Sequence, residues 1–219
     1  MTTRPLSQLA ISAARWPPAA ALVSLLAFGA VFPEKYGILP SWARWPMWVL
    51  VLGLIVLSTF AHTSPVLRRL ESAVTSWLVA LVTGLVVFGV ARLVAIVLAE
   101  GAEVRGLPLL STGITLWVAN MVAFSLWYWL LDRGGPEERL RGAQAVHDFK
   151  FQHAVDLPGG AWTPHFFDYV YVAFNTSIAF SPTDTTPMTT RVKALMMAQA
   201  LLSLVTLVIV VARAVNILD

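Results

Sequence analysis

The chain has 219 residues, of which 58% are hydrophobic and only 12% are charged. Its mean hydropathy is +0.73, so we expect an integral membrane protein rather than a soluble domain. Lys and Arg (15) outnumber Asp and Glu (12), but the excess lies between apolar runs, which favours topology-setting loops over a nucleic-acid-binding surface. No cysteine is present in the sequence, which excludes disulfides and thiolate metal sites.

Uncharged runs in the first part of the chain predict four transmembrane spans, at residues 16–33, 45–67, 72–99 and 106–131. The first run also has the flanks of a signal peptide, but we favour a retained helix because further spans follow. Arg92 interrupts the third run, and we expect the helix to end near Val90 with Arg92 reaching the interface; the alternative is a functional arginine inside the span. Asn120 lies mid-run and is interpreted as a residue that bonds helices together.

The segment from Asp132 to Ala161 is polar and predicts a linker with a short amphipathic helix that starts at Pro136. Four of its side chains have the chemistry of metal ligands: His147, Asp148, His153 and Asp156. Their spacing does not repeat on one helical face, so we interpret them as solvated loop residues. No catalytic motif is found, and we expect no enzyme activity, metal or cofactor.

A short apolar helix is predicted from Pro164 to Phe180, with Thr163 as its N-cap and Asp168 near the positive end of its dipole. Pro182 ends it. Its length would be roughly 25 Å at 1.5 Å per residue, which is short for a hydrocarbon core about 30 Å thick. A short membrane helix that breaks into a polar Ser-Pro-Thr-Asp turn is typical of a re-entrant pore loop.

The last predicted helix carries a polar stripe. Nineteen uncharged residues separate Lys193 from Arg213, enough to span a membrane. Gln199, Ser203, Thr206 and Arg213 share one face of this helix. Such a stripe either bonds to neighbouring helices or faces water. The pore-like loop before it favours the interpretation that Gln199, Ser203 and Thr206 line a pore, together with Thr176 of the preceding helix.

The region from Thr176 onward resembles the pore region of tetrameric potassium channels. Aligned without gaps, Thr176 falls on the family's pore-helix threonine, Asp184 falls on the aspartate after the filter, and the helix from Arg191 resembles the inner helix. The filter pentapeptide falls on Ala179, Phe180, Ser181, Pro182 and Thr183. Ser181 and Thr183 replace the two glycines that let the filter aim its carbonyls at the ion, so we do not expect potassium selectivity. This C-terminal part also resembles an uncharacterised family of bacterial integral membrane proteins of unknown function.

Asp184 precedes the start of the predicted last helix. Its carboxylate is expected to accept hydrogen bonds from backbone or hydroxyl groups of its own turn, with any attraction of cations secondary. Thr186 is expected to be the N-cap of the helix that follows.

The charge distribution and the resemblance disagree about orientation. A cytoplasmic N-terminus places eight Lys and Arg inside and three outside, as the positive-inside rule prefers. The linker is then cytoplasmic, whereas potassium channels present their pore loop from outside. Three solutions stay open: entry from the cytoplasmic side, as in ionotropic glutamate receptors; a full crossing by residues 164–183; or a misleading charge bias.

We therefore expect an all-α polytopic transmembrane protein of the cell membrane, with four spans, a short re-entrant pore-like helix and a long final span. The expected regions are 1–131 (spans), 132–163 (linker) and 164–219 (pore-like helix, filter-like turn and inner helix). The leading hypothesis is an oligomeric pore-loop channel for small inorganic ions, for which the resemblance suggests a tetramer surrounded by lipid, with Ser181 to Asp184 at the constriction. The alternative is a non-conducting structural or accessory membrane protein. Nucleic acid is not an expected partner.

Overall fold

A computed structural model describes residues 49, 52–53, 65–100, 106–140, 147–152, 162–178 and 184–218 of the chain. The predicted first span, most of the second span and the filter-like residues 179–183 lie outside the described residues. Most of the described chain is helical, as expected. The exception is one two-stranded sheet that the all-α prediction did not include.

Three long helices form the body of the described part of the chain: α3 (Pro65–Glu100), α4 (Gly106–Leu131) and α8 (Thr190–Leu218). Three segments are long and apolar enough to cross a membrane: Leu70–Ala99 in α3, Pro108–Gly134 in α4 and the three residues after it, and Thr190–Ala212 in α8. The bounds of α4 are those predicted from the uncharged run. The expected helix end near Val90 is wrong, because α3 continues for ten more residues. No proline or glycine lies between Arg92 and Glu100, so nothing local stops the helix at Val90.

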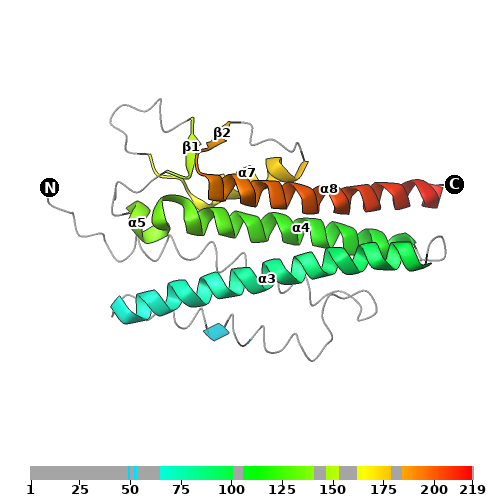
Figure 1. Ribbon diagram of the computed structural model, residues 1–219, viewed down its shortest axis with the longest axis horizontal. Coiled ribbons are helices and arrows are strands. Elements are labelled where there is room, and N and C mark those ends of the chain that lie inside the picture. The colour runs from blue at the N-terminus through cyan, green and yellow to red at the C-terminus, as the bar shows by residue number, and fades with distance from the viewer. Residues whose placement is uncertain are drawn as a thin grey trace.

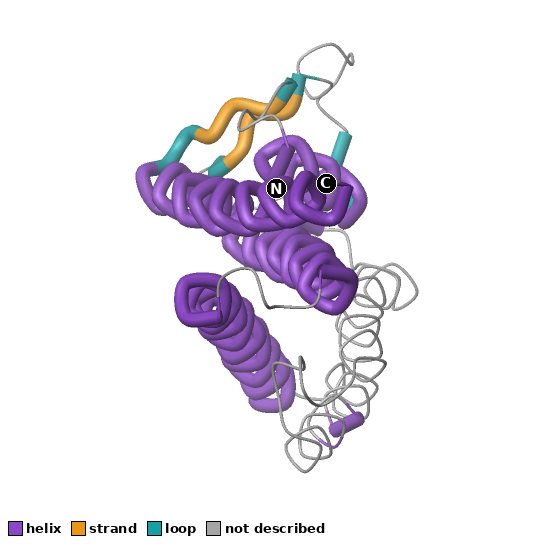
Figure 2. Tube along the Cα trace, turned by 90° about the vertical axis from the view of Figure 1, so that its right-hand side faces the viewer, coloured by secondary structure: helices purple, strands orange, loops and turns teal. Residues whose placement is uncertain are grey.

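α4 lies at the centre and packs against α3 on one side and against α8 and α7 (Phe166–Ile178) on the other (Figure 2). Apolar side chains fill the contact with α3, and the indole Nε1 of Trp127 donates a hydrogen bond of 2.9 Å to Thr83 Oγ1. α4 and α8 approach closely at Gly113, where an added Cβ would lie only 2.4 Å from Cγ2 of Val210.

The start of α3, the end of α4 and the start of α8 lie at one end of the bundle (Figure 1). Four short elements also gather there: η3 (Asp132–Gly134), α5 (Pro136–Leu140), β1 (Phe149–Phe151) and β2 (Thr185–Pro187). We call this region, residues 132–140, 147–151 and 184–193, the polar end. α5 begins at Pro136 as predicted. Gly134 and Gly135 have φ values of 77° and 100°, which glycine tolerates, and they turn the chain out of α4.

The two strands tie the polar linker to the segment before α8. They are antiparallel, with Phe149 opposite Pro187, Lys150 opposite Thr186 and Phe151 opposite Thr185. Phe149 and Phe151 point into a core shared with α4, α7 and α8, whereas Lys150 is exposed. The described part of the linker is thus integrated into the same core as the C-terminal region.

α7 begins two residues later than predicted. The backbone N–H of His165 donates a hydrogen bond of 2.6 Å to Asp168 Oδ2, so His165 occupies the cap position instead of Thr163. The expected place of Asp168 in the first turn is confirmed. The 13 residues of α7 make a helix about 20 Å long.

α7 runs from the polar end towards the middle of the bundle. Near its start, the ring of Phe166 meets that of Trp129 on α4, with centroids 6.2 Å apart. Further along, Phe174 meets Trp117, which lies twelve residues earlier on α4, or roughly 18 Å deeper. β2 then brings the chain back beside β1, so the segment from Phe166 to Pro187 leaves the polar end and returns to it (Figure 1).

Candidate functional site

The polar stripe of α8 points into the protein. Gln199, Ser203 and Thr206 are 0%, 0% and 1% exposed, so they share one buried face as the periodicity predicted. The exposed face of α8 is apolar instead, and includes Met197, Leu201, Leu204, Val205 and Val208. The side chain of Arg213 lies outside the described residues.

Gln199 joins three helices. Its Oε1 accepts a hydrogen bond from the hydroxyl of Tyr128 on α4. Its Nε2 donates to the Ala173 carbonyl (2.7 Å) and to Ser177 Oγ (2.8 Å), both on α7. Both donors of the amide group are therefore satisfied inside the protein.

Asn120 makes a second connection between α4 and α8. Its Nδ2 donates to the Gln199 carbonyl (3.2 Å) and to Ser203 Oγ (2.8 Å). These contacts confirm the expectation that Asn120 bonds helices together. Its Oδ1 is buried without a hydrogen-bond partner.

The two buried threonines of the expected pore make only local hydrogen bonds. Thr206 Oγ1 donates to the Leu202 carbonyl (2.7 Å), and Thr176 Oγ1 donates to the Val172 carbonyl (2.8 Å). Thr176 is 2% exposed. Each hydroxyl therefore satisfies itself on its own helix, as Ser and Thr in membrane helices commonly do.

α7 docks through a face of small and aromatic residues. Its buried positions are Tyr169, Val172, Ala173, Thr176 and Ser177, which follow a helical period. The small side chains of Ala173 and Ser177 let α7 approach α8 closely enough for Gln199 to reach both. Its outer face is exposed and apolar, with Phe167, Phe174 and Ile178.

Asp132 organises the polar end. The residue is fully buried, and its Oδ1 accepts hydrogen bonds from the backbone N–H groups of Asp148 (3.1 Å) and Phe149 (3.2 Å). Its Oδ2 accepts a hydrogen bond of 2.6 Å from the hydroxyl of Tyr169 on α7. One carboxylate thereby connects the end of α4 to β1 and to α7.

Arg139 closes the C-terminal end of α4. Its Nη1 donates to the carbonyls of Trp129 and Asp132, each at 2.7 Å. The Asp132 carbonyl also accepts a hydrogen bond of 3.0 Å from the backbone N–H of Gly135, and the negative end of the helix dipole favours a cation there. The guanidinium also lies over the rings of Trp129 (5.4 Å) and Tyr169 (5.2 Å). Burial lowers the pKa of Arg139 from its ordinary value, and the Asp132 carboxylate opposes this shift.

Asp148 is not a solvated loop residue, and that interpretation is wrong. Its side chain is fully buried. Arg191, at the start of α8, pairs with both oxygens of its carboxylate, and the hydrogen bond from Arg191 Nε to Asp148 Oδ1 is 2.7 Å long. The hydroxyl of Thr189 donates to the same carboxylate. Burial raises the pKa of Asp148, but the hydrogen bonds from Arg191 and Thr189 outweigh it and hold the pKa below its ordinary value.

No metal site is evident among the described residues, which hold no suitable group of three or more His, Cys, Asp or Glu. His147 is exposed next to the buried Asp148. His153 and Asp156 lie outside the described part of the chain.

Expectations about the turn before α8 differ from what the described residues show. Asp184 is exposed, and its hydroxyl partner in the described part of the chain is Tyr171 of α7 at 3.5 Å, outside its own turn; residues 179–183 are not among those described. Thr186 does not cap α8, because it belongs to β2, and the helix begins at Thr190. The pairing with β1 holds this stretch extended where the sequence suggested a helix start.

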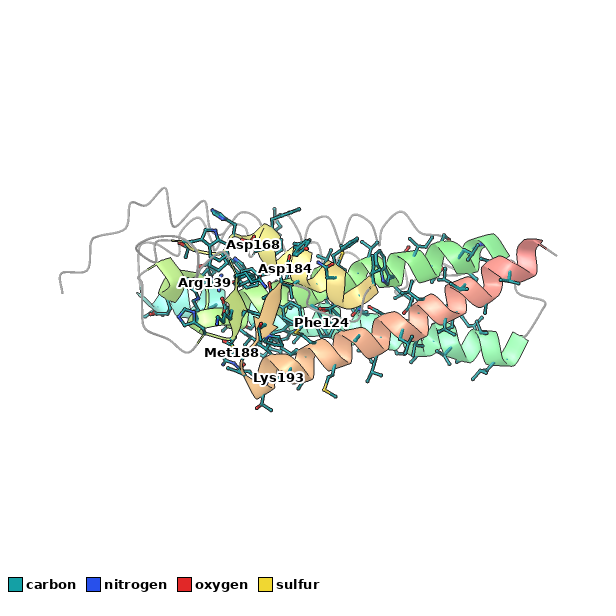
Figure 3. All side chains as sticks on the ribbon, turned by 90° about the horizontal axis from the view of Figure 1, so that it is seen from above. Phe124, Arg139, Asp168, Asp184, Met188 and Lys193 are labelled. Atoms are coloured by element: carbon teal, nitrogen blue, oxygen red, sulfur yellow. The ribbon has the colours of Figure 1, made fainter. Side chains whose placement is uncertain are left out.

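Arg139, Asp168, Asp184 and Lys193 all lie in the half of the bundle that holds the polar end (Figure 3). Sequence reasoning missed the roles of Asp132 and Arg139 in this cluster. The available signal was an acid at the end of an apolar run, followed seven residues later by an arginine. Comparisons of the chain with protein-family models, with curated proteins and with solved structures find no match.

Proposed function

We propose that the protein is a non-conducting integral membrane protein with a structural or accessory role. The observation that carries this proposal is the burial of Gln199, Ser203 and Thr206 against α4 and α7. A residue that lines a pore on an oligomer axis must be exposed on the surface of the single chain. The surface that α8 exposes is apolar and suits lipid tails or an apolar partner helix.

The hydrogen bonds of this face favour a fixed arrangement. Interhelical hydrogen bonds in membranes are worth about 0.6 kcal/mol each on average. Gln199 and Asn120 together make five such bonds between α4, α7 and α8. Turning α8 to present these groups to water would break all of them at once.

We further propose that α7 is a re-entrant helix that enters the membrane part of the way. Two observations support this: its length of about 20 Å is well short of a hydrocarbon core about 30 Å thick, and the chain returns to the polar end through β2. Together with two N-terminal spans outside the described residues, the protein would then have the four spans, re-entrant helix and final span expected from its sequence.

A pore-loop channel is the second candidate, because one observation favours it. α7 packs against two antiparallel long helices, α4 and α8, and is followed in the sequence by the Ser-Pro-Thr-Asp stretch. In this alternative a homo-oligomer, as in tetrameric channels, would conduct small ions past Ser181 to Asp184 without potassium selectivity.

Ion flux through liposomes that contain the purified protein separates the two candidates. We expect the flux of sodium, potassium and chloride to equal that of protein-free liposomes. Ser203→Leu should lower thermal stability in detergent, because it removes one of the two hydrogen-bond partners of Asn120, whereas Leu204→Ala on the exposed face is the control. Flux through the wild-type protein that Ser203→Leu or Thr206→Leu changes without loss of stability would overturn the proposal in favour of the channel.

A further inference from the structure

We propose that the polar end of the bundle lies at the cytoplasmic face of the membrane, so that α7 enters from the cytoplasm. The orientation stands independently of whether the protein conducts. It follows from which ends of the helices lie together and from where the basic residues are.

Contacts define the two ends of the bundle. At the polar end, Arg191 of α8 binds Asp148 and also donates to the carbonyl of Leu131, the last residue of α4 (3.3 Å). At the opposite end, Leu93 of α3 packs in one cluster with Leu109 of α4. These contacts assign the residues before and after α7 to one end of the bundle. The assignment does not depend on which side of the membrane holds the N-terminus.

Basic residues concentrate at the polar end. Seven lie in elements that start or end there: Arg68, Arg69, Arg133, Arg139, Lys150, Arg191 and Lys193. Among the described residues the opposite end has two, Arg92 and Arg213, towards the ends of α3 and α8. The return of the chain through β2 is what adds Arg191 and Lys193 to the polar end, and hydropathy alone does not reveal that return.

The positive-inside rule converts this asymmetry into an orientation. Lys and Arg within about 15–20 residues of a span end are retained on the cytoplasmic side. The anionic lipids of the cytoplasmic leaflet add about 1 kcal/mol of attraction for each basic residue near the surface. Lys150 and Lys193 are exposed at the polar end, near the start of α8, where they can contact anionic headgroups. Entry of α7 from this side is opposite to the direction of the potassium-channel pore loop.

The absence of cysteine allows a direct test by single-cysteine labelling in membranes. His147→Cys places a thiol at an exposed position of the polar end without changing the number of Lys and Arg. Val215→Cys is the matched control, since Val215 is 53% exposed on α8 beyond the candidate span that ends at Ala212. A membrane-impermeant maleimide is applied to right-side-out and to inside-out vesicles of each variant.

We expect His147→Cys to react only in inside-out vesicles and Val215→Cys only in right-side-out vesicles. The reverse pattern would overturn the orientation. Labelling of both positions from the same side would overturn the assignment of the two ends. If His147→Cys does not accumulate, Lys150→Cys is the second variant, because Lys150 is exposed on β1. A phosphatase that requires export, fused to the C-terminus, should be active, and an inactive fusion would likewise contradict the proposal.

Discussion

At the scale of single residues, buried charged groups determine how the polar end is built. The Asp132 carboxylate accepts three hydrogen bonds from three different residues. Arg139 donates to the carbonyls of Trp129 and Asp132 at the C-terminal end of α4. A hydrogen bond to a charged group contributes about 1.5–3 kcal/mol to stability. Removing the charged group leaves its buried donors without an acceptor, which costs further free energy. Asp132 therefore fixes the position of α7 and β1 relative to α4.

We predict that Asp132→Ala lowers the stability of the protein by about 3 kcal/mol or more, because the Tyr169 hydroxyl and two backbone N–H groups lose their acceptor. Thermal unfolding in detergent, followed by tryptophan fluorescence, measures the change. Asp184→Ala is the control: this aspartate is exposed and its hydrogen bond to Tyr171 in the described part of the chain is long, so the melting temperature should hardly move. Equal effects of the two substitutions would show that the cluster around Asp132 contributes little.

Asp148 should make stability depend on pH. Its pKa is lowered in the folded protein, so the stability it contributes is present above the ordinary aspartate pKa and is lost as the pH falls through the lowered value. We expect the melting temperature of the wild-type protein to fall in acid below about pH 4, and Asp148→Asn to be less stable at neutral pH with a flatter acid profile. A variant that keeps the wild-type profile would contradict the role assigned to the pair with Arg191.

At the scale of elements, α7 is short and has little core of its own, so its contacts with α4 and α8 hold it in place. The polar bonds of Gln199 lie at its deep half, and the Asp132 cluster lies at its start. A helix anchored at both ends has one docking position. Its outer face stays apolar, as expected for contact with lipid or another apolar surface.

Gln199→Leu is predicted to loosen α7. It removes three hydrogen bonds at about 0.6 kcal/mol each and leaves the Tyr128 hydroxyl unsatisfied, so we expect a loss of about 2 kcal/mol. Hydrogen exchange at the amides of residues 166–178 should become faster, while exchange in α3 changes less. The control is Met197→Leu, two positions away on the exposed face. If exchange in α7 is unchanged by Gln199→Leu, the docking does not depend on this side chain.

Some of these elements can be predicted from the sequence and others cannot. The bounds of α4 follow from the charges that flank its apolar run, Arg105 and Asp132, because charged groups avoid the hydrocarbon. The sheet could not be predicted, because each strand has three residues and the partners lie 34 or more residues apart. Periodicity showed that Gln199, Ser203 and Thr206 share a face, but one helix alone does not reveal what that face meets.

At the scale of the whole molecule, α4, α7 and α8 enclose a polar interior that belongs to one chain, and α3 packs against the other side of α4. Polar side chains on α4, α7 and α8 form hydrogen bonds with one another, and most of the basic residues in the described part of the chain belong to elements at the polar end. This arrangement explains why a polar stripe occurs on an apolar helix without requiring an aqueous pore. The central claim is therefore that the polar stripe of α8 faces the interior of the protein.

Reactivity of cysteines at the stripe tests that claim most directly. Ser203→Cys and Thr206→Cys, each the only cysteine in its chain, are treated in native membranes with a small water-soluble thiol reagent. We predict no modification until the protein is unfolded in strong detergent, because both positions are at most 1% exposed and face protein. Rapid modification of either cysteine in native membranes would show that this face of α8 meets water, and would contradict the account.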